Sequence, residues 1–416
     1  MSEFTFDEKC SYASGISRRD FGRMSTTAAA IAAGSTIPLL NGCWNGGTKD
    51  KEPVLKIGYI PILDASPLLV GYAKGFFQEQ GIKVEKPKLI RGWSQISEAF
   101  LSGSFNLVHL LFPIPIYMKF AQKHPVRVVG WDHMYGSGLT VGLDTGVSQL
   151  DDLAGKQIAV PYWYSIHNII LQQWLREYGI NAVMQDSQKP LEKGQTNLVV
   201  MAPPDMPTAM SGGSIDGYIV AEPFNAVGEV KAKGKIVRFT GDSFKNHPCC
   251  VAAMHERDLE THPEWSQRVL NALVKSQAWL SENREEAAEL LSRDGDGFIP
   301  FPKEIVDRAL NKYDEEEYGI GVGTGAIKHP EWDVKRFNAQ PYPFKSATRE
   351  IVKLMKRTKV EGDSKFLRDL DPEIVIDELF DYDFVTKAIE ENGGLAQFDG
   401  IDPDNPFERR ETISIR

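Results

Sequence analysis

The alternation of short apolar runs with helical patterns, which begins at Val54, constrains the fold more than any other feature of this sequence. Val54–Ile60, Ile82–Ile90 and Phe105–Leu110 read as buried strands, and segments 67–81 and 94–101 have helical periodicity. Strands that alternate with helices predict parallel sheets covered by helices on both faces. We therefore expect an α/β fold.

The alternation restarts after Gly136–Gly138, and this restart predicts a second lobe. Within it, Pro207–Ser211 reads as a turn, and Pro248–Met254 reads as the strand that returns to the first lobe. Chain crossings near Gly136–Gly138 and Thr240–His247 would form a hinge, and a cleft between two lobes is where small ligands bury most of their surface. The expected parts are lobe 1 (54–136), lobe 2 (137–241), and a return to lobe 1 with extra C-terminal helices (242–416).

Residues 1–43 have the pattern of an export signal. Arg18 and Arg19 precede an apolar run, 28–33, which is shorter than the ~20 residues that a membrane span needs. The paired arginines, with Phe21 after them, resemble a twin-arginine signal, although Gly22 departs from the usual leucine. The segment 40–43 resembles a lipobox, which implies that Cys43 is lipidated. A plain cleaved signal is the alternative, and 44–53 reads as a flexible tether.

Composition excludes some classes of protein. A length of 416 residues suggests two or three domains. The net charge is −10 without basic clusters, which argues against nucleic acid as a partner. Of the four cysteines, Cys10 and Cys43 lie in the leader, so only Cys249 and Cys250 remain in the body. This pair does not make a disulfide scaffold and reads as two small buried residues.

Several motifs together resemble the nitrate/sulfonate/bicarbonate-binding family of ABC transporters, to which thiamine-precursor binders are related. The motifs are GYIPILDASPL at 58–68, AKGFF at 73–77, Trp93, LVH at 107–109 with Pro113, AEPFN at 221–225, NHP at 246–248 and YPFKS at 342–346. The similarity covers Val54 to Met355, and the leader fits the lipoprotein branch of the family.

The resemblance implies a two-lobed periplasmic-binding fold (type II), each lobe a mostly parallel sheet flanked by helices, that closes on its ligand. It also implies a monomer without a cofactor, held in the periplasm by a lipid anchor. The expected partners are a small-molecule solute and the ABC permease and ATPase subunits.

Candidate ligand-binding residues follow the ends of predicted strands. Asp64 follows the first strand, where open α/β sheets bind ligands, but it could also be a turn or helix-cap residue. Trp93 lies between a strand and a helix. Trp163 and Tyr164 belong to an aromatic run at 162–164, of which at least one ring should face the cleft. His167 and Glu222 could contact ligand or support the structure.

Two departures from the nitrate binders concern the charge of the ligand. Cys250 stands where those proteins have lysine, and Ser137 stands where they have glutamine. A desolvated anion needs donors and positive charge, so the remaining acids and aromatic residues suit a cationic or planar solute. Two ligand classes therefore stay open: a small anion (nitrate, bicarbonate, sulfonate), or a guanidinium or pyrimidine-type thiamine precursor.

No catalytic or metal-binding motif is evident. The pairs His124/His133 and His255/His262 do not fit zinc-site spacing, so no metal site is predicted. There is no nucleophile elbow, P-loop or dinucleotide fingerprint. We expect a binding component of an importer and not an enzyme. The alternatives are an enzyme of thiamine-precursor type built on the same fold, or a ligand sensor without a transporter.

Overall fold

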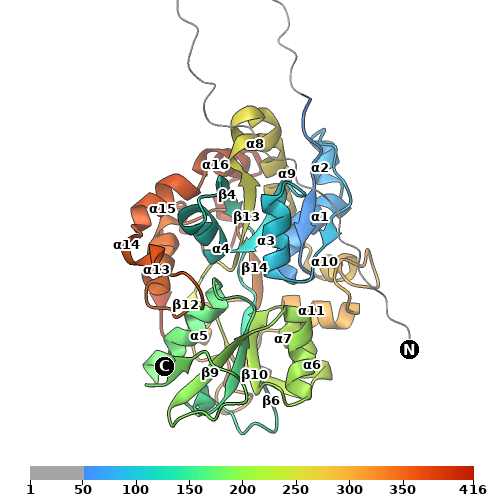
Figure 1. Ribbon diagram of the computed structural model, residues 1–416. Coiled ribbons are helices and arrows are strands. Elements are labelled where there is room, and N and C mark those ends of the chain that lie inside the picture. The colour runs from blue at the N-terminus through green and yellow to red at the C-terminus, as the bar shows by residue number, and fades with distance from the viewer. Residues whose placement is uncertain (1–50) are drawn as a thin grey trace, which may run out of the picture. The chain divides into compact units, whose positions relative to one another are not determined.

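The computed structural model describes residues 51–416 (Figure 1). The predictions on Arg18, Arg19 and Cys43 lie outside this range. Among the described residues, no helix combines the length and the apolar character that crossing a membrane requires. Residues 52–416 form one unit with two large sheets, and we call the parts built on them lobe 1 and lobe 2.

The sheet of lobe 1 has five strands. Their order is β2 (Lys88–Leu89), β1 (Ile57–Tyr59), β3 (Leu107–Leu111), β13 (Cys250–His255) and β4 (Val126–Trp131). Strand β13 is antiparallel to both neighbours and pairs Cys250 with Leu111 and Val251 with Trp131. As predicted, the chain returns from lobe 2 to lobe 1 through this strand. Because β13 is reversed, it begins at the edge where the other strands end.

The sheet of lobe 2 has six strands. Their order is β11 (Gly234–Phe239), β6 (Ser137–Gly142), β10 (Gly217–Ala221), β7 (Gln157–Val160), β9 (Gln195–Val200) and β8 (Asn181–Val183). Here β6 is the reversed strand, and the pairs β10–β7, β7–β9 and β9–β8 are parallel. Helix α5 (Ile166–Glu177) lies on one side of this sheet, and α6 (Met206–Ser211) and α7 (Phe224–Lys231) lie on the other (Figure 1). The predicted mostly parallel sheets flanked by helices are confirmed.

Two short strand pairs accompany the crossings between the lobes. Strand β5 (His133–Tyr135) pairs with β14 (Phe337–Ala339), and β12 (Phe244–Lys245) pairs with β15 (Thr412–Ile413). Gly136 alone separates β5 from β6, and its φ of 73° is in the left-handed region that glycine tolerates best. Its N–H donates to Arg336 and its carbonyl accepts from Glu222. The first crossing of the chain between the lobes therefore depends on the conformation of Gly136.

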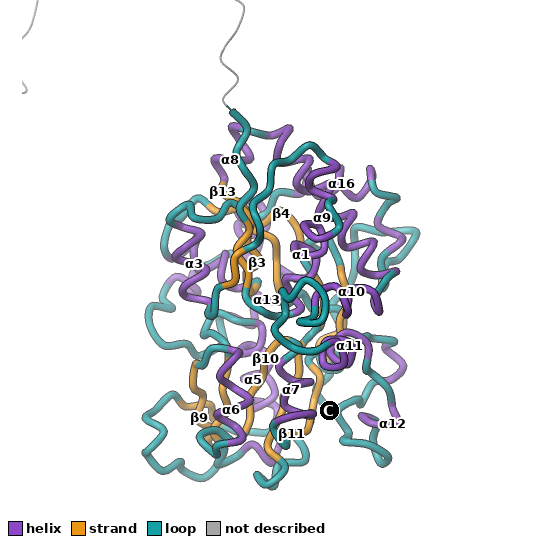
Figure 2. Tube along the Cα trace, turned by 90° about the vertical axis from the view of Figure 1, so that its right-hand side faces the viewer, coloured by secondary structure: helices purple, strands orange, loops and turns teal. Residues whose placement is uncertain are grey.

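The helices cover the sheets and extend beyond them (Figure 2). They are α1 (Ser66–Ala73), α2 (Phe76–Glu79), α3 (Trp93–Leu101), α4 (Pro113–Ile116), α5 (Ile166–Glu177), α6 (Met206–Ser211), α7 (Phe224–Lys231), α8 (Glu256–Thr261), α9 (Pro263–Glu282), α10 (Arg284–Leu291), α11 (Lys303–Asn311), α12 (Glu315–Tyr318), α13 (Lys345–Met355), α14 (Phe366–Asp369), α15 (Pro372–Leu379) and α16 (Tyr382–Glu391). In lobe 1, α3 packs on β1 and β3, while α15 and α16 pack on β4.

Three local predictions are wrong. The segment 82–90 is not a buried strand: only Lys88–Leu89 form strand β2, and both residues are exposed, because charged residues and Pro87 interrupt the apolar run. The helix expected over 67–81 is broken between α1 and α2, because Gly75 adopts a φ of 77° and starts a new turn. The segment Pro207–Ser211 is not a turn but most of helix α6. Pro207 is the second residue of that helix, where the missing N–H costs no hydrogen bond.

Candidate functional site

The candidate site lies where the strands of lobe 1 end. Asp64 is in a short 3₁₀ helix, Leu63–Ala65, that follows β1, and His133 follows β4 by one residue. Cys249 and Cys250 lie at the start of the reversed strand β13. Three separate segments therefore bring their side chains to the carboxyl edge of one sheet, where α/β folds bind ligands.

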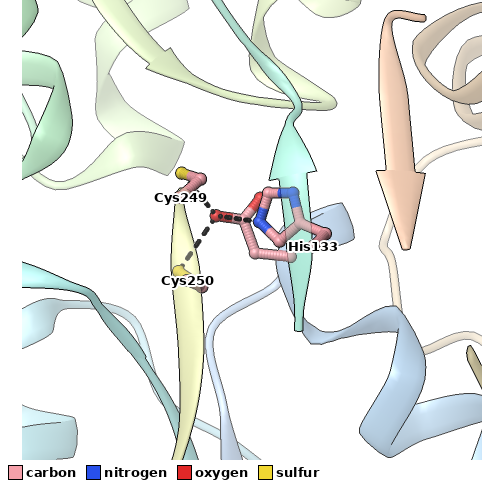
Figure 3. A group of neighbouring side chains, drawn as sticks. His133, Cys249 and Cys250 are labelled. Carbon is pink, nitrogen blue, oxygen red and sulfur yellow. Dashed lines mark hydrogen bonds and ion pairs between the residues drawn. The ribbon is translucent and has the colours of Figure 1, made fainter. Parts of the chain in front are cut away.

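The side chains of His133, Cys249 and Cys250 surround one carboxylate oxygen of Asp64 (Figure 3). Oδ2 of Asp64 lies 3.1 Å from His133 Nε2, 3.3 Å from Cys249 Sγ and 3.1 Å from Cys250 Sγ. The four potential ligand atoms lie within 4.8 Å of one another, and all four residues are fully buried. We call this group the DHCC cluster.

Burial and mutual contacts shift the ionisation of the DHCC cluster. Burial raises the pKa of Asp64 to about 6. Burial alone would lower the pKa of His133, but the Asp64 carboxylate holds that pKa well above its usual range. Burial also opposes ionisation of Cys249, yet contacts with Cys250, His167 and His133 hold the Cys249 pKa well below its usual value. The pKa of Cys250 is raised well above its usual value by burial and by the neighbouring Cys249 and Asp64.

Polar atoms around the DHCC cluster lack hydrogen-bond partners. They are Asp64 Oδ1, both carboxylate oxygens of Asp132, His109 Nδ1, His167 Nδ1 and Trp93 Nε1. His133 Nε2 belongs to the same set, because its 3.1 Å approach to Asp64 lacks hydrogen-bond geometry. Burial raises the pKa of Asp132 well above its usual range and lowers that of His109 to about 3. Unpaired buried polar groups are costly, so these atoms need a partner that the described residues do not supply.

Lobe 2 covers the cluster with two of the predicted residues. Ser137 begins β6, and its Oγ lies 3.7 Å from Cys249 Sγ and 2.8 Å from His167 Nε2. His167 is the second residue of α5, after β7. The structure thus brings together four residues predicted from sequence: Asp64, Ser137, His167 and Cys250. A fifth, Trp93, packs edge-on against His109 beside them, with ring centroids 5.5 Å apart.

Glu222 interacts with Arg336 and not with the DHCC cluster. Its Oε1 accepts from Arg336 Nε at 2.7 Å, and its Oε2 accepts from the Ala226 N–H at 3.2 Å. Arg336 also pairs with Glu229 at 3.1 Å and donates to the Tyr318 hydroxyl at 2.9 Å. The structural alternative considered for Glu222 matches this placement: it fixes the hinge to the C-terminal part of the chain.

Trp163 and Tyr164 face the C-terminal helices rather than the DHCC cluster. Both line a small cavity together with Met355 of α13 and Leu367 of α14. Tyr164 stacks on Tyr117 of lobe 1, with ring centroids 4.3 Å apart, and its hydroxyl donates to the Asp363 carbonyl. These aromatic residues therefore join lobe 2 to lobe 1 and to the C-terminal segment.

Sequence reasoning missed His133, Cys249, Asp132 and His109 as members of the site. Metal ligands are recognised in a sequence by short, regular spacing, whereas these residues come from different segments of the chain. The adjacent acid and imidazole of Asp132 and His133, placed directly after a predicted strand, were the available signal.

Two sheets whose carboxyl edges meet around a buried polar cluster define the periplasmic-binding-protein class of fold. The profile of the NMT1-like family matches residues 48–292, more than half of the chain, and the chain belongs to this family.

Individual relatives agree with this assignment. The nitrate/nitrite binding protein NrtA of Nostoc is 27% identical over 379 residues, which cover 80% of this chain and 81% of that protein. The crystal structure of the periplasmic nitrate-binding protein NrtA from Synechocystis has a TM-score of 0.67 at 18% identity, over 86% of this chain and 97% of that one. A ligand-binding component of an ABC-type import system from Staphylococcus aureus, solved with zinc bound, has a TM-score of 0.61 at 20% identity, over 81% and 99% of the two chains. At these identities the structural likeness concerns the fold alone.

These comparisons confirm the family resemblance and the two-lobed fold. As a homologue of solute-binding proteins, the chain is a binding component and not an enzyme.

Proposed function

We propose that the chain is the extracytoplasmic solute-binding component of an ABC importer, and that it captures a small cation between its lobes for delivery to a permease. The family and the relatives named as binding proteins support the role in import. One observation carries the choice of site: the buried DHCC cluster, with its unpartnered polar atoms, lies where the two lobes meet.

The charges around the cluster favour a cation over nitrate, bicarbonate or a sulfonate. A buried anion requires donors and positive charge. The site instead has two acids, Asp64 and Asp132, against one basic group, His133, and none of the groups that shift the pKa of Asp132 is a lysine or an arginine. The buried Arg336 is already paired with Glu222 and Glu229. This distribution agrees with the loss of the family lysine at Cys250.

Contacts between the lobes would break when the cleft opens. The Leu63 N–H donates to the Glu222 carbonyl at 2.8 Å, and Arg91 pairs with Asp205 at 2.7 Å on the surface. A solute that binds only the closed form shifts the population toward it. Closure would then present the loaded protein to its permease.

We also propose that the leader exports the chain by the twin-arginine route through Arg18 and Arg19, and that lipidated Cys43 anchors a monomer. The sequence pattern of residues 1–43 supports the export route and the anchor. The boundaries 54–136, 137–241 and 242–416 remain our proposal for the two lobes and the C-terminal extension.

The test combines thermal melting with small-angle scattering on the full chain. The panel contains nitrate, bicarbonate, a sulfonate, guanidinium, a pyrimidine thiamine precursor and divalent metal salts. We expect a cation to raise the melting temperature, because a ligand that binds only the folded state stabilises it by about 2.7 kcal/mol at 100 times its Kd, and to reduce the radius of gyration. If no solute changes either quantity, the proposal is wrong. Tight nitrate binding would contradict the argument from charge.

A further inference from the structure

Building on the proposed function, we infer that the captured cation is a thiophilic divalent metal ion of the Zn²⁺ class, bound directly by the DHCC cluster. The donor set consists of two cysteine sulfurs, one imidazole nitrogen and one carboxylate oxygen. These are the ligand types that Zn²⁺ uses in proteins. Nothing in the sequence spacing indicated this site.

The geometry of the cluster fits one ion. Zn–S bonds are about 2.3 Å and Zn–N bonds about 2.0–2.1 Å, so the ligand atoms of a tetrahedral site lie roughly 3.3–3.8 Å apart. In the DHCC cluster, Asp64 Oδ2 lies 3.1–3.3 Å from the other three atoms, and no two of the four are more than 4.8 Å apart. Small adjustments of these side chains would admit a metal ion, whereas a polyatomic solute would not fit between them.

The neighbours of His133 orient its ring as metal sites require. His133 Nδ1 lies 3.2 Å from the Met134 carbonyl oxygen, and because that oxygen only accepts, Nδ1 carries the proton. The imidazole also stacks on Phe337, with centroids 4.7 Å apart and planes inclined by 14°. Nε2 is therefore the nitrogen that faces Asp64. Metal-ligating histidines commonly donate their second N–H to a carbonyl or carboxylate in this way.

The two lobes have different roles in binding: lobe 1 supplies the ligands and lobe 2 covers them. All four ligands come from segments next to the strand ends of the lobe 1 sheet. An ion could therefore bind while the lobes are apart. Ser137 of lobe 2 then lies 3.7 Å from the Cys249 sulfur and hydrogen-bonds His167, which closes the site to water. Opening the lobes would expose the ion again for transfer.

The chemistry of the ligands also sets selectivity. Thiolate and imidazole select Zn²⁺ and similar metals, whereas Mg²⁺ and Ca²⁺ prefer six or more oxygens. On binding, any proton on the Cys249 sulfur, the Cys250 sulfur or His133 Nε2 is released to solvent, and the lone pair freed on each atom forms its bond to the metal.

The experiment measures Zn²⁺ binding to the full chain by equilibrium dialysis with metal analysis, together with its melting temperature. Cys10 and Cys43 are replaced by serine in every variant, so that only Cys249 and Cys250 can supply sulfur. Asp64→Asn, His133→Gln, Cys249→Ser and Cys250→Ser test the ligands one at a time. His255→Gln is the matched control, because His255 lies at the far end of the same strand, β13. Asp258→Asn is a second control at a buried acid on α8.

We expect one Zn²⁺ per chain, a raised melting temperature, and no competition from excess Mg²⁺ or Ca²⁺. Each ligand variant should weaken binding by at least about 100-fold, while both controls retain it. Asp64→Asn preserves side-chain volume, and its circular dichroism spectrum shows whether a loss of binding reflects a loss of folding.

Three results would overturn the inference: no stoichiometric Zn²⁺, Zn²⁺ binding that the ligand variants leave unchanged, or a Cys249–Cys250 disulfide in the exported chain. If another solute still stabilises and closes the protein, the proposed function stands without the metal. If no solute does so, both proposals fail.

Discussion

Nε2 of His133 lies 3.1 Å from Oδ2 of Asp64, and both side chains are fully buried. One follows strand β4 and the other follows β1, so only the assembled sheet brings them together. Cys249 and Cys250 complete the group from the reversed strand β13. Predictions about stability and binding follow from this arrangement and from the hinge beside it.

The hinge ion pair should contribute strongly to stability. Removing one partner of a buried pair leaves an uncompensated charge and costs about 3–5 kcal/mol, so we expect Arg336→Met to lower the free energy of unfolding by that amount. Arg349→Met is the matched control, because Arg349 pairs with Glu373 on the surface, where such pairs are worth about 0–1 kcal/mol. Denaturant unfolding measures both, and equal losses would contradict the role of Arg336.

Gly136 should be required both for its backbone angle and for the room it leaves His133. A Cβ at Gly136 would lie 3.0 Å from the His133 ring, whereas one at Gly146, with a similar φ of 75°, would meet nothing within 4 Å. Either alanine substitution incurs the left-handed backbone cost of roughly 1–2 kcal/mol. We expect Gly136→Ala to cost more than Gly146→Ala in unfolding experiments, and to weaken solute binding. If Gly136→Ala and Gly146→Ala weakened solute binding equally, the conformation of the hinge at Gly136 would not influence the site.

The stack between Tyr117 and Tyr164 should couple the lobes. Their rings lie 4.3 Å apart at 17°, and such pairs contribute about 0.5–1.5 kcal/mol beyond buried area. A double-mutant cycle with alanine at both positions should recover a coupling of this size in the free energy of unfolding. Tyr164→Phe is the control, since it keeps the stack and loses the hydrogen bond to Asp363. A coupling energy near zero would contradict the prediction that this stack couples the lobes.

His109 should make the protein sensitive to acid. Burial lowers its pKa to about 3. Between about pH 6.5 and pH 3, the unfolded chain therefore binds a proton at this residue and the folded chain does not. The stability that this histidine contributes is complete above pH 6.5 and is lost as the pH falls toward 3. We expect His109→Gln, which can still accept from the Ile60 N–H, to flatten the dependence of unfolding free energy on pH in that window. If the dependence of unfolding free energy on pH were the same in His109→Gln, the acid sensitivity would not come from His109.

The leader should control location. We expect Arg18→Lys with Arg19→Lys to retain the precursor in the cytoplasm. Cys43→Ala should release an exported chain from the membrane fraction. Immunoblots of fractionated cells distinguish the two outcomes, and membrane association that survives Cys43→Ala would contradict lipid anchoring at that residue.

Much of the fold could be predicted, because many elements carry their own signals. Strands β3 and β13 and helix α3 lie within two residues of their predicted bounds, where apolar runs are bounded by turns or polar ends. The break at Gly75 and helix α6 were missed because they depend on one backbone angle and on proline in a first helical turn. Asp64 was predicted from its place after the first strand, and Cys250 from the comparison with the nitrate binders.

The composition of the cluster could not be read from the sequence. His133 has no partner at metal-site spacing, and Cys249 and Cys250 alone indicate small buried residues. Their meeting depends on β13 running opposite to β3 and β4, which places the start of one strand beside the ends of the others. Strand order and direction are tertiary properties that hydrophobic periodicity does not encode.

Zinc K-edge X-ray absorption of the full chain, loaded with one equivalent of Zn²⁺ in the Cys10→Ser, Cys43→Ser background, tests the central claim most directly. A site made by the DHCC cluster predicts two sulfur neighbours at about 2.3 Å and two nitrogen or oxygen neighbours at about 2.0–2.2 Å. A spectrum without a sulfur shell would place the metal elsewhere and contradict the account.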